Sequence, residues 1–158
     1  MAFEPLEIQK WIYQTLQGDS TLQTLLAGSK APNYQVGVYS QIAPEKDAVS
    51  QYMPQLPYIV FSRSGSVGTD ETVLCGGRYY TVPAYRVTAW DNNNGSISYQ
   101  RIKPIIDRVD VLLNQQKVTV DGITFFCQRY DTSQPFEISG DGRFDYGLTL
   151  LYRFNTLV

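Results

Sequence analysis

The residues that could carry chemistry in this chain are Ser66, set in a glycine-rich stretch, and a few scattered carboxylates. The run Ser64-Gly65-Ser66-Val67-Gly68 is close to the Gly-x-Ser-x-Gly turn that presents a nucleophilic serine, but its first glycine is missing. The chain also contains no histidine. Because histidine is the commonest general base and the commonest metal ligand, most hydrolytic and zinc-dependent chemistry would need unusual substitutes. We therefore predict that the protein is not an enzyme.

The carboxylates predict no metal or cofactor site either. Asp107 and Asp110 stand three apart on an expected helix, and we interpret them with Arg108 as its solvated face. The run from Ser139 to Asp145 lacks the ordered oxygen ligands of a calcium loop and is typical of a turn before a strand. The glycines around residues 65–77 are not followed by the Lys-Ser or Lys-Thr of a phosphate-binding loop, so they indicate turns.

Length and composition predict one globular domain spanning residues 1–158. Hydrophobic residues make up 43% of the chain and charged residues 18%, which is ordinary for a domain that buries a real core. Aromatic residues reach 13%, with 12 tyrosines, and tyrosine is enriched both in sheets and at protein interfaces. These numbers favour a protein that builds a shape and contacts other proteins.

Charge and targeting signals narrow the expected partners and compartment. The net charge of −2 comes without any cluster of Lys and Arg, which argues against a surface built to bind nucleic-acid phosphates. The first residues carry Glu4, Glu7 and Lys10 and form no signal peptide or membrane span, so we expect a cytosolic protein. Cys75 and Cys127 share no CxxC spacing and are interpreted as unpaired thiols in a reducing compartment.

Three amphipathic segments predict helices. Ile8, Trp11, Ile12 and Leu16 recur at helical spacing over residues 7–17. Asp19 or Ser20 is placed to cap a short second helix that contains residues 22–26. The clearest helical pattern covers residues 102–113, where Pro104 should lie in the first turns or cause a kink.

Three long segments rich in Tyr, Phe, Val and Leu predict strands over residues 57–63, 78–91 and 143–155. Residues 56–61 are apolar at consecutive positions, which is typical of a strand covered on both faces, as at a subunit contact. Pro83 suggests that the second strand lies at an edge or beside a bulge. Asp121-Gly122 between two alternating runs indicates a tight hairpin, and residues 35–39 look like a short strand.

This order of elements predicts an α+β fold, with an antiparallel or mixed sheet, helices packed on one face, and extended loops or hairpin arms. The other sheet face would remain partly open, and we expect another copy of the chain to cover it. An apolar run in a polar, glycine-rich stretch also needs a partner. The predicted subunit interface therefore comprises Val73, Leu74, Cys75, Tyr79, Tyr80 and Trp90.

Eight segments follow one another in a characteristic order. They are the helix with Leu6, Ile8, Ile12 and Leu16, then Leu22 to Leu26, Val38-Tyr39, Leu56-Pro57-Tyr58-Ile59-Val60-Phe61, Tyr85-Arg86-Val87-Thr88-Ala89-Trp90, the helix from Ile102 to Leu113, Val120-Asp121-Gly122 and Leu150-Leu151-Tyr152-Arg153-Phe154. This ordered set resembles the small tail-terminator and tail-completion proteins of long-tailed bacteriophages, also described as minor-tail or head-tail joining proteins. The resemblance covers nearly the whole chain, and it departs from the family in a longer, more polar insertion at residues 46–55 and an extended loop at residues 131–142.

The resemblance implies a ring, in such proteins usually of six copies, at the head-proximal end of the tail tube. Such a ring stops tube polymerisation and presents a surface to the head connector. The expected partners are further copies of the chain, the tube protein, the sheath if the tail contracts, and the connector. DNA would pass through the ring without sequence-specific binding, and no cofactor or membrane is implied. The expected location is the virion tail or neck, after assembly in the host cytoplasm.

Two other hypotheses remain open at this stage. The same pattern fits a neck or connector protein between portal and tail, such as an adaptor or stopper. A ligand-binding module or enzyme would instead need a pocket lined by convergent carboxylates such as Asp141 and Asp145, or by tyrosine hydroxyls.

Overall fold

The computed structural model describes residues 5–27, 37–41, 56–67, 82–92, 96–120, 122–133, 136–140 and 143–157. In these ranges the fold is α+β with a mixed sheet, as predicted. In chain order the elements are α1 (Pro5–Gly18), α2 (Ser20–Ala27), β1 (Val38–Ser40), β2 (Tyr58–Val67), β3 (Val82–Asn92), α3 (Ser96–Leu113), β4 (Gln116–Val120), β5 (Ile123–Thr132), β6 (Phe136–Gly140) and β7 (Arg143–Leu157).

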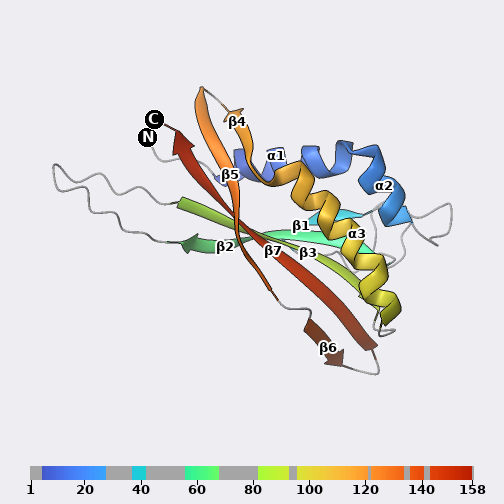
Figure 1. Cartoon of the computed structure of the whole chain (residues 1–158). Coiled ribbons are helices and arrows are strands. Elements are labelled where there is room, and N and C mark those ends of the chain that lie inside the picture. The colour runs from blue at the N-terminus through green and yellow to red at the C-terminus, as the bar shows by residue number, and fades with distance from the viewer. Residues whose placement is uncertain are drawn as a thin grey trace.

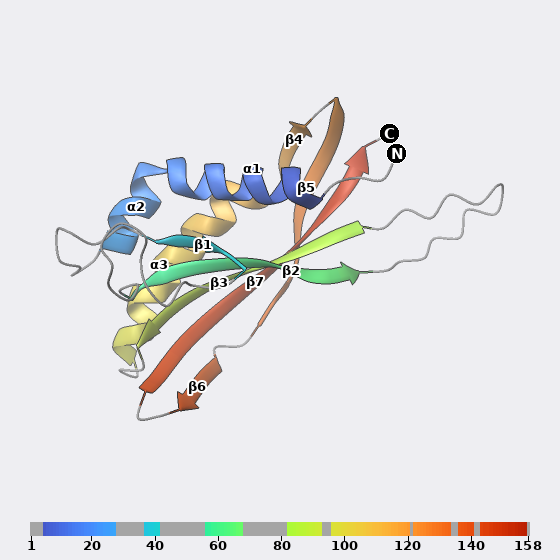
Figure 2. The ribbon, with the colours of Figure 1, turned by 180° about the vertical axis from the view of Figure 1, so that it is seen from behind.

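The sheet is organised around β7, its longest strand (Figures 1 and 2). The strand order is β1-β2-β3-β7-β5-β4, and β6 pairs with β7 beside this path. Strand β3 follows one edge of β7, while β5 and β6 follow the other edge one after the other. Only the contact of β1 with β2 is parallel among the described pairings. Strand β7 therefore connects both halves of the sheet.

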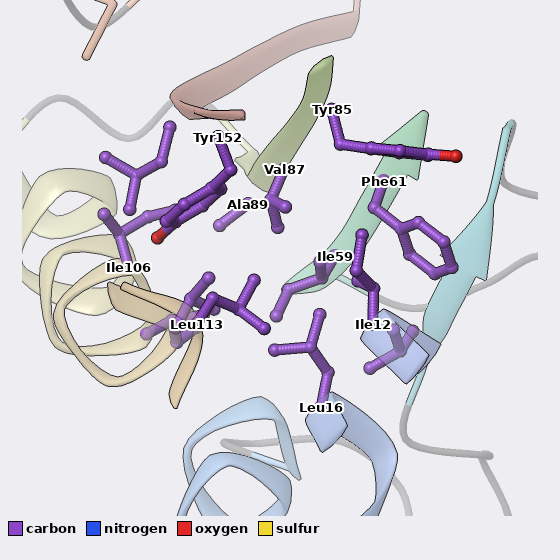
Figure 3. Close-up of a cluster of buried hydrophobic side chains, with 14 of the residues drawn as sticks. Ile12, Leu16, Ile59, Phe61, Tyr85, Val87, Ala89, Ile106, Leu113 and Tyr152 are labelled. Atoms are coloured by element: carbon purple, nitrogen blue, oxygen red, sulfur yellow. The ribbon is translucent and has the colours of Figure 1, made fainter. Parts of the chain in front are cut away.

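All three described helices lie on one side of the sheet, as the figures show, and the core lies between them and the strands (Figures 1 and 3). Helix α3 packs on β3, β5 and β7, while α1 packs on β1 and α3. Cross-strand pairs such as Tyr85 with Tyr152 and Val87 with Leu150 supply the inward side chains. The predicted alternation of both long strands is therefore confirmed, because period-two patterning sends every second side chain to the helix side.

The helix side chains that enter this core match the predicted stripes, and they are buried to 3% exposure or less. They are Ile8, Ile12 and Leu16 of α1, Leu22 and Leu26 of α2, and Ile102, Ile105, Ile106, Val109 and Leu113 of α3. Trp11 packs edge-on against Phe154, with ring centroids 5.8 Å apart. The apolar stripes of all three helices thus meet a single sheet face.

Asp19 begins α2 as its N-cap, as predicted. Its Oδ1 accepts a hydrogen bond from the Leu22 backbone N–H at 2.7 Å. The same carboxylate accepts two bonds from Arg108 of α3, from Nε at 3.0 Å and from Nη2 at 2.6 Å. One side chain therefore caps α2 and connects it to α3.

Two further ion pairs attach α3 to the sheet. Near its N-terminus, Arg101 Nε lies 3.3 Å from Oδ2 of the fully buried Asp91 at the end of β3. Near its C-terminus, Asp110 accepts hydrogen bonds from Tyr152 Oη at 3.1 Å and from Arg129 Nη1 at 2.9 Å. The interpretation of Asp110 as part of a solvated face is therefore wrong. Because β7 and β5 pass beneath this turn of α3, their Tyr152 and Arg129 reach it, whereas Asp107 remains exposed.

Pro104 and Pro83 both lie at positions where proline is uncommon, inside a helix and inside a sheet. Helix α3 begins at Ser96, earlier than predicted, so Pro104 falls in its middle. Strand β3 is an interior strand between β2 and β7, which contradicts an edge position for Pro83. The alternative, a bulge, is confirmed, since the register of β2 shifts between Arg63 and Ser66, and Ser66 is the partner of Pro83.

The β4–β5 hairpin confirms a tight turn between these strands; of the predicted pair, Gly122 is described, and Asp121 lies outside the described residues. Val120 pairs with Ile123 across it, and Gly122 has a φ of 78°, which suits glycine because it has no Cβ. Gln115, just past the end of α3, also has a positive φ, of 60°. It occupies the left-handed position that commonly ends a helix and turns the chain directly into β4.

Replacing Leu150 tests the packing of β7. Leu150 is 1% exposed on the helix side of the sheet, so Leu150→Ala should lower the free energy of unfolding by about 2–5 kcal/mol in urea denaturation. Val111→Ala is the matched control, because Val111 is 63% exposed and should change stability by no more than about 0.5 kcal/mol. Equal losses in the two variants would contradict the orientation of β7.

Asp19 predicts a specific pH dependence of stability. The hydrogen bond from Arg108, with help from the Leu22 N–H, lowers the pKa of Asp19 from its ordinary value of 3.8. A lowered folded-state pKa adds stability above the ordinary pKa, and this stability is lost as the pH falls through the folded value. Asp19→Asn keeps an N-cap but removes the charge, so the wild type should exceed the variant in stability at neutral pH.

The difference between wild type and Asp19→Asn should shrink below about pH 4 in thermal melts. Asp107→Asn is the control, since Asp107 forms only an exposed pair with Lys103. A wild-type advantage over Asp19→Asn that stays constant down to pH 2 would contradict the role of the ion pair.

Candidate interaction surface

The side of the sheet opposite the helices, here called the outer face, is the candidate functional surface. None of the helices or strands in the described ranges packs over it (Figures 1 and 2). The registers place alternate residues of β1, β2, β3 and β7 on it. Its partly exposed apolar side chains are Tyr39, Tyr58, Val60, Trp90 and Leu151. Aromatic residues on such a surface are typical of protein contacts.

Aromatic rings gather at one end of the outer face. Tyr39 of β1 and Tyr58 of β2 meet edge-on, with centroids 5.8 Å apart. The Tyr39 ring lies so close over Gly37 that a Cβ there would come within 2.3 Å of it. Trp90 pairs with Tyr58 on one side and with Gly147 on the other. A glycine leaves room for a neighbouring aromatic ring to pack directly on the backbone, so this end of the outer face is apolar and closely packed.

The middle of the outer face is closely packed and uncharged. Thr88 and Thr149 stand opposite each other in β3 and β7, and their hydroxyl oxygens are 2.7 Å apart. Both residues are buried, at 5% and 7% exposure. A cross-strand threonine pair satisfies two polar groups without drawing in charge. This middle zone can therefore be covered by a partner without leaving a buried charge.

The other end of the outer face carries charge. Arg86 is exposed and has no ion-pair partner within the described part of the chain. Arg153 donates from Nε and Nη2 to Oε1 of Gln128, at 3.2 and 2.9 Å. Asp131, opposite Leu151 in the register, is also exposed. Arginine and aromatic residues are the side chains most enriched where binding energy concentrates at interfaces.

The polar side chains between α3 and the sheet include a buried thiol and a buried phenol, Cys127 and Tyr152. Burial raises the pKa of the Cys127 thiol, and the negative charge of Asp110 raises it further. Burial likewise raises the pKa of Tyr152, again with a contribution from Asp110. A thiol held in its protonated form is a poor nucleophile. The cluster of Asp110, Tyr152 and Arg129 therefore serves to join α3 to the sheet.

Over the described ranges, no group of three or more His, Cys, Asp or Glu side chains is placed to hold a metal ion. No helix in the same ranges is both long and apolar enough to cross a membrane. Of the residues considered for chemistry, Ser66 lies within β2 and Asp145 within β7, while Asp141 is outside the described residues.

Among the predicted interface residues, Trp90 lies on the outer face, half-buried. Val73, Leu74, Cys75, Tyr79 and Tyr80 are outside the described residues, so their placement stays a prediction. Sequence reasoning missed Tyr39, Tyr58, Arg86 and Leu151 as members of this surface. The available signal was the alternation within residues 56–61, where Ile59 and Phe61 are buried and Tyr58 and Val60 are only half-buried.

Comparisons with known proteins add a likeness of fold. A solved chain described as "Virion of native gene transfer agent (GTA) particle" matches with a TM-score of 0.59 and 12% identity, over 92% of this chain and 90% of that chain. A second solved chain, known only by a sequence identifier, matches with a TM-score of 0.52 and 12% identity over 99% of both chains. No family model and no curated protein matches the sequence. The α+β arrangement is thus shared over nearly the whole length of both chains.

Tryptophan fluorescence tests the exposure of the outer face, because the chain has only Trp11 and Trp90. Both tryptophans are half-buried, but Trp11 packs on the core beside Phe154, whereas Trp90 lies on the outer face. Acrylamide should therefore quench Trp90 in Trp11→Phe more than it quenches Trp11 in Trp90→Phe, when the protein is dilute. Identical quenching of the two variants would contradict the placement of Trp90.

Proposed function

We propose that this protein is a structural component of a phage-type virion, and that it acts as a tail terminator or tail-completion protein. The observation that carries the proposal is the fold match with a chain of a gene transfer agent virion, which extends over 92% of this chain and 90% of that one. It agrees with the resemblance of the ordered sequence segments to phage tail-completion proteins. At 12% identity the match supports the class of protein through the shared fold.

The proposed role is a closed ring, of six copies as is usual in such proteins, that caps the head-proximal end of the tail tube. A ring needs two different, complementary surfaces on each copy, whose contact repeats by rotation until it closes. It also needs one surface for the tube and another for the head connector. The outer face, with aromatic rings at one end and arginines at the other, supports a role in one of these contacts.

The chemistry of the described residues supports assembly more than catalysis. Cys127 and Tyr152 are buried on the helix side of the sheet, and Asp110 of α3 accepts hydrogen bonds from Tyr152 and Arg129 within the protein. The chain's net charge of −2 suits a ring through which DNA slides without adhering. The proposed partners are further copies, the tube protein, any sheath, and the connector, and the proposed location is the tail or neck of the particle.

Electron microscopy of a source phage with a stop codon in this gene tests the position in the particle. Loss of a tail terminator should leave tails of abnormal length beside unjoined, DNA-filled heads. Tails of normal length lying apart from heads would instead move the protein to the neck, as an adaptor or stopper. Normal, infectious particles would contradict a virion role.

A complementing plasmid that supplies the wild-type gene is the control for the stop-codon phage, and it should restore joined particles.

The mass of the purified chain, measured with and without tube protein, tests ring formation in vitro. A ring of six copies of the 17.9 kDa chain has a mass of about 107 kDa.

A further inference from the structure

One row of residues across the outer face carries a balanced pair of charges. Arg86 of β3, Leu151 of β7 and Asp131 of β5 are in register with one another. Leu151 thus has a cation on the strand to one side and an anion on the strand to the other. Neighbouring strands lie about 4.8 Å apart, so the two charged residues are separated by roughly 10 Å at the backbone.

Both charges are available to a partner. Arg86 and Asp131 are exposed, and within the described part of the chain neither forms an ion pair. There, four other carboxylates already pair with cations of the same chain, Asp19 with Arg108, Asp91 with Arg101, Asp107 with Lys103 and Asp110 with Arg129. Asp131 makes only a local bond, in which its Oδ1 accepts from the Thr132 N–H at 2.8 Å. The row therefore has a positive charge on one side of Leu151 and a negative charge on the other, and neither is paired within the described part of the chain.

We propose that in the free protein this outer face docks on the outer face of a second copy, through a two-fold axis that runs along β7. Such an axis reverses the order of strands across the face and keeps their direction. It brings Arg86 over Asp131 of the partner subunit, and Asp131 over Arg86 of the partner subunit. Leu151 then meets Leu151 of the partner subunit at the axis. Two ion pairs thus flank an apolar contact.

The charges also exclude the other simple arrangement. A two-fold axis across the strands would place Arg86 against Arg86 of the partner subunit, and like charges in contact are unfavourable. Sheets that pack face to face lie about 10 Å apart, a gap that an arginine and an aspartate side chain can span together. The pattern of one cation and one anion therefore selects the axis along β7.

The side chains around this row are compatible with the proposed contact. Arg153 is the next outward residue of β7, and its guanidinium is hydrogen-bonded to Gln128 of β5. That bond holds its charge to the β5 side of the axis, away from Arg153 of the partner subunit. Val60, Trp90 and the Thr88–Thr149 pair continue the uncharged surface beside Leu151. A central apolar zone with charges around it is the usual anatomy of a protein interface.

This pairing does not depend on the proposed function. A two-fold contact closes with two copies and cannot propagate into a ring. It would keep the aromatic outer face covered in the free protein, and any ring that uses the same face would form only after the dimer opens.

Charge reversal tests the axis directly. Native mass spectrometry over a concentration series should show a wild-type dimer of about 36 kDa, two copies of the 17.9 kDa chain. Arg86→Glu places two acids at each contact, and Asp131→Arg places two bases, so each variant by itself should be monomeric. An equal mixture of the two variants restores both ion pairs and should recover a dimer that contains one copy of each.

Lys10→Glu is the matched control, because it reverses an exposed charge on α1, on the helix side, and should leave the dimer intact. Circular dichroism checks that each variant remains folded. A wild type that is monomeric at every concentration overturns the proposal, as do dimeric single variants. Recovery of a ring rather than a dimer in the mixture would also overturn it, because it would assign the same charge pair to a head-to-tail contact. None of these outcomes affects the stop-codon result for virion position.

Discussion

The packing of α3 on the centre of the sheet is the constraint on which the rest of the structure depends. Its apolar stripe covers β3, β5 and β7 together, and its polar side chains make three ion pairs with α2, β3 and β5. Removing apolar side chains from water drives this packing, whereas the pairs mainly specify orientation. Because α3 contacts both halves of the sheet, it determines which face becomes the core.

Once α3 has selected one face as the core, the opposite face carries none of the described helices. The outer face has a different composition from the core. Small residues, Gly147, Thr88 and Thr149, lie between the partly exposed Trp90 and Leu151. Its backbone is held by β7, whose two edges are both paired along much of its length. A rigid surface loses little conformational entropy on binding, so this face is well suited to assembly.

The two faces of the sheet differ in how deeply their side chains are buried. On the helix side, Leu150 is almost fully buried, so replacing it removes packing contacts that stabilise the fold. On the outer face, Trp90 and Leu151 are only partly buried, so replacing them should cost less stability.

The sequence by itself determined the α+β class, the helical stripes, an N-cap at Asp19 or Ser20, the tight turn before β5, the alternation of β3 and the inward residues of β7. These features depend on local periodicity and turn chemistry, which neighbouring residues encode. Only the tertiary structure decided that Asp110 accepts hydrogen bonds from Tyr152 and Arg129, that β3 is interior despite Pro83, and that Arg86, Leu151 and Asp131 form one row. These relations join residues far apart in the chain, and strand order and register are set by the packing of the whole sheet.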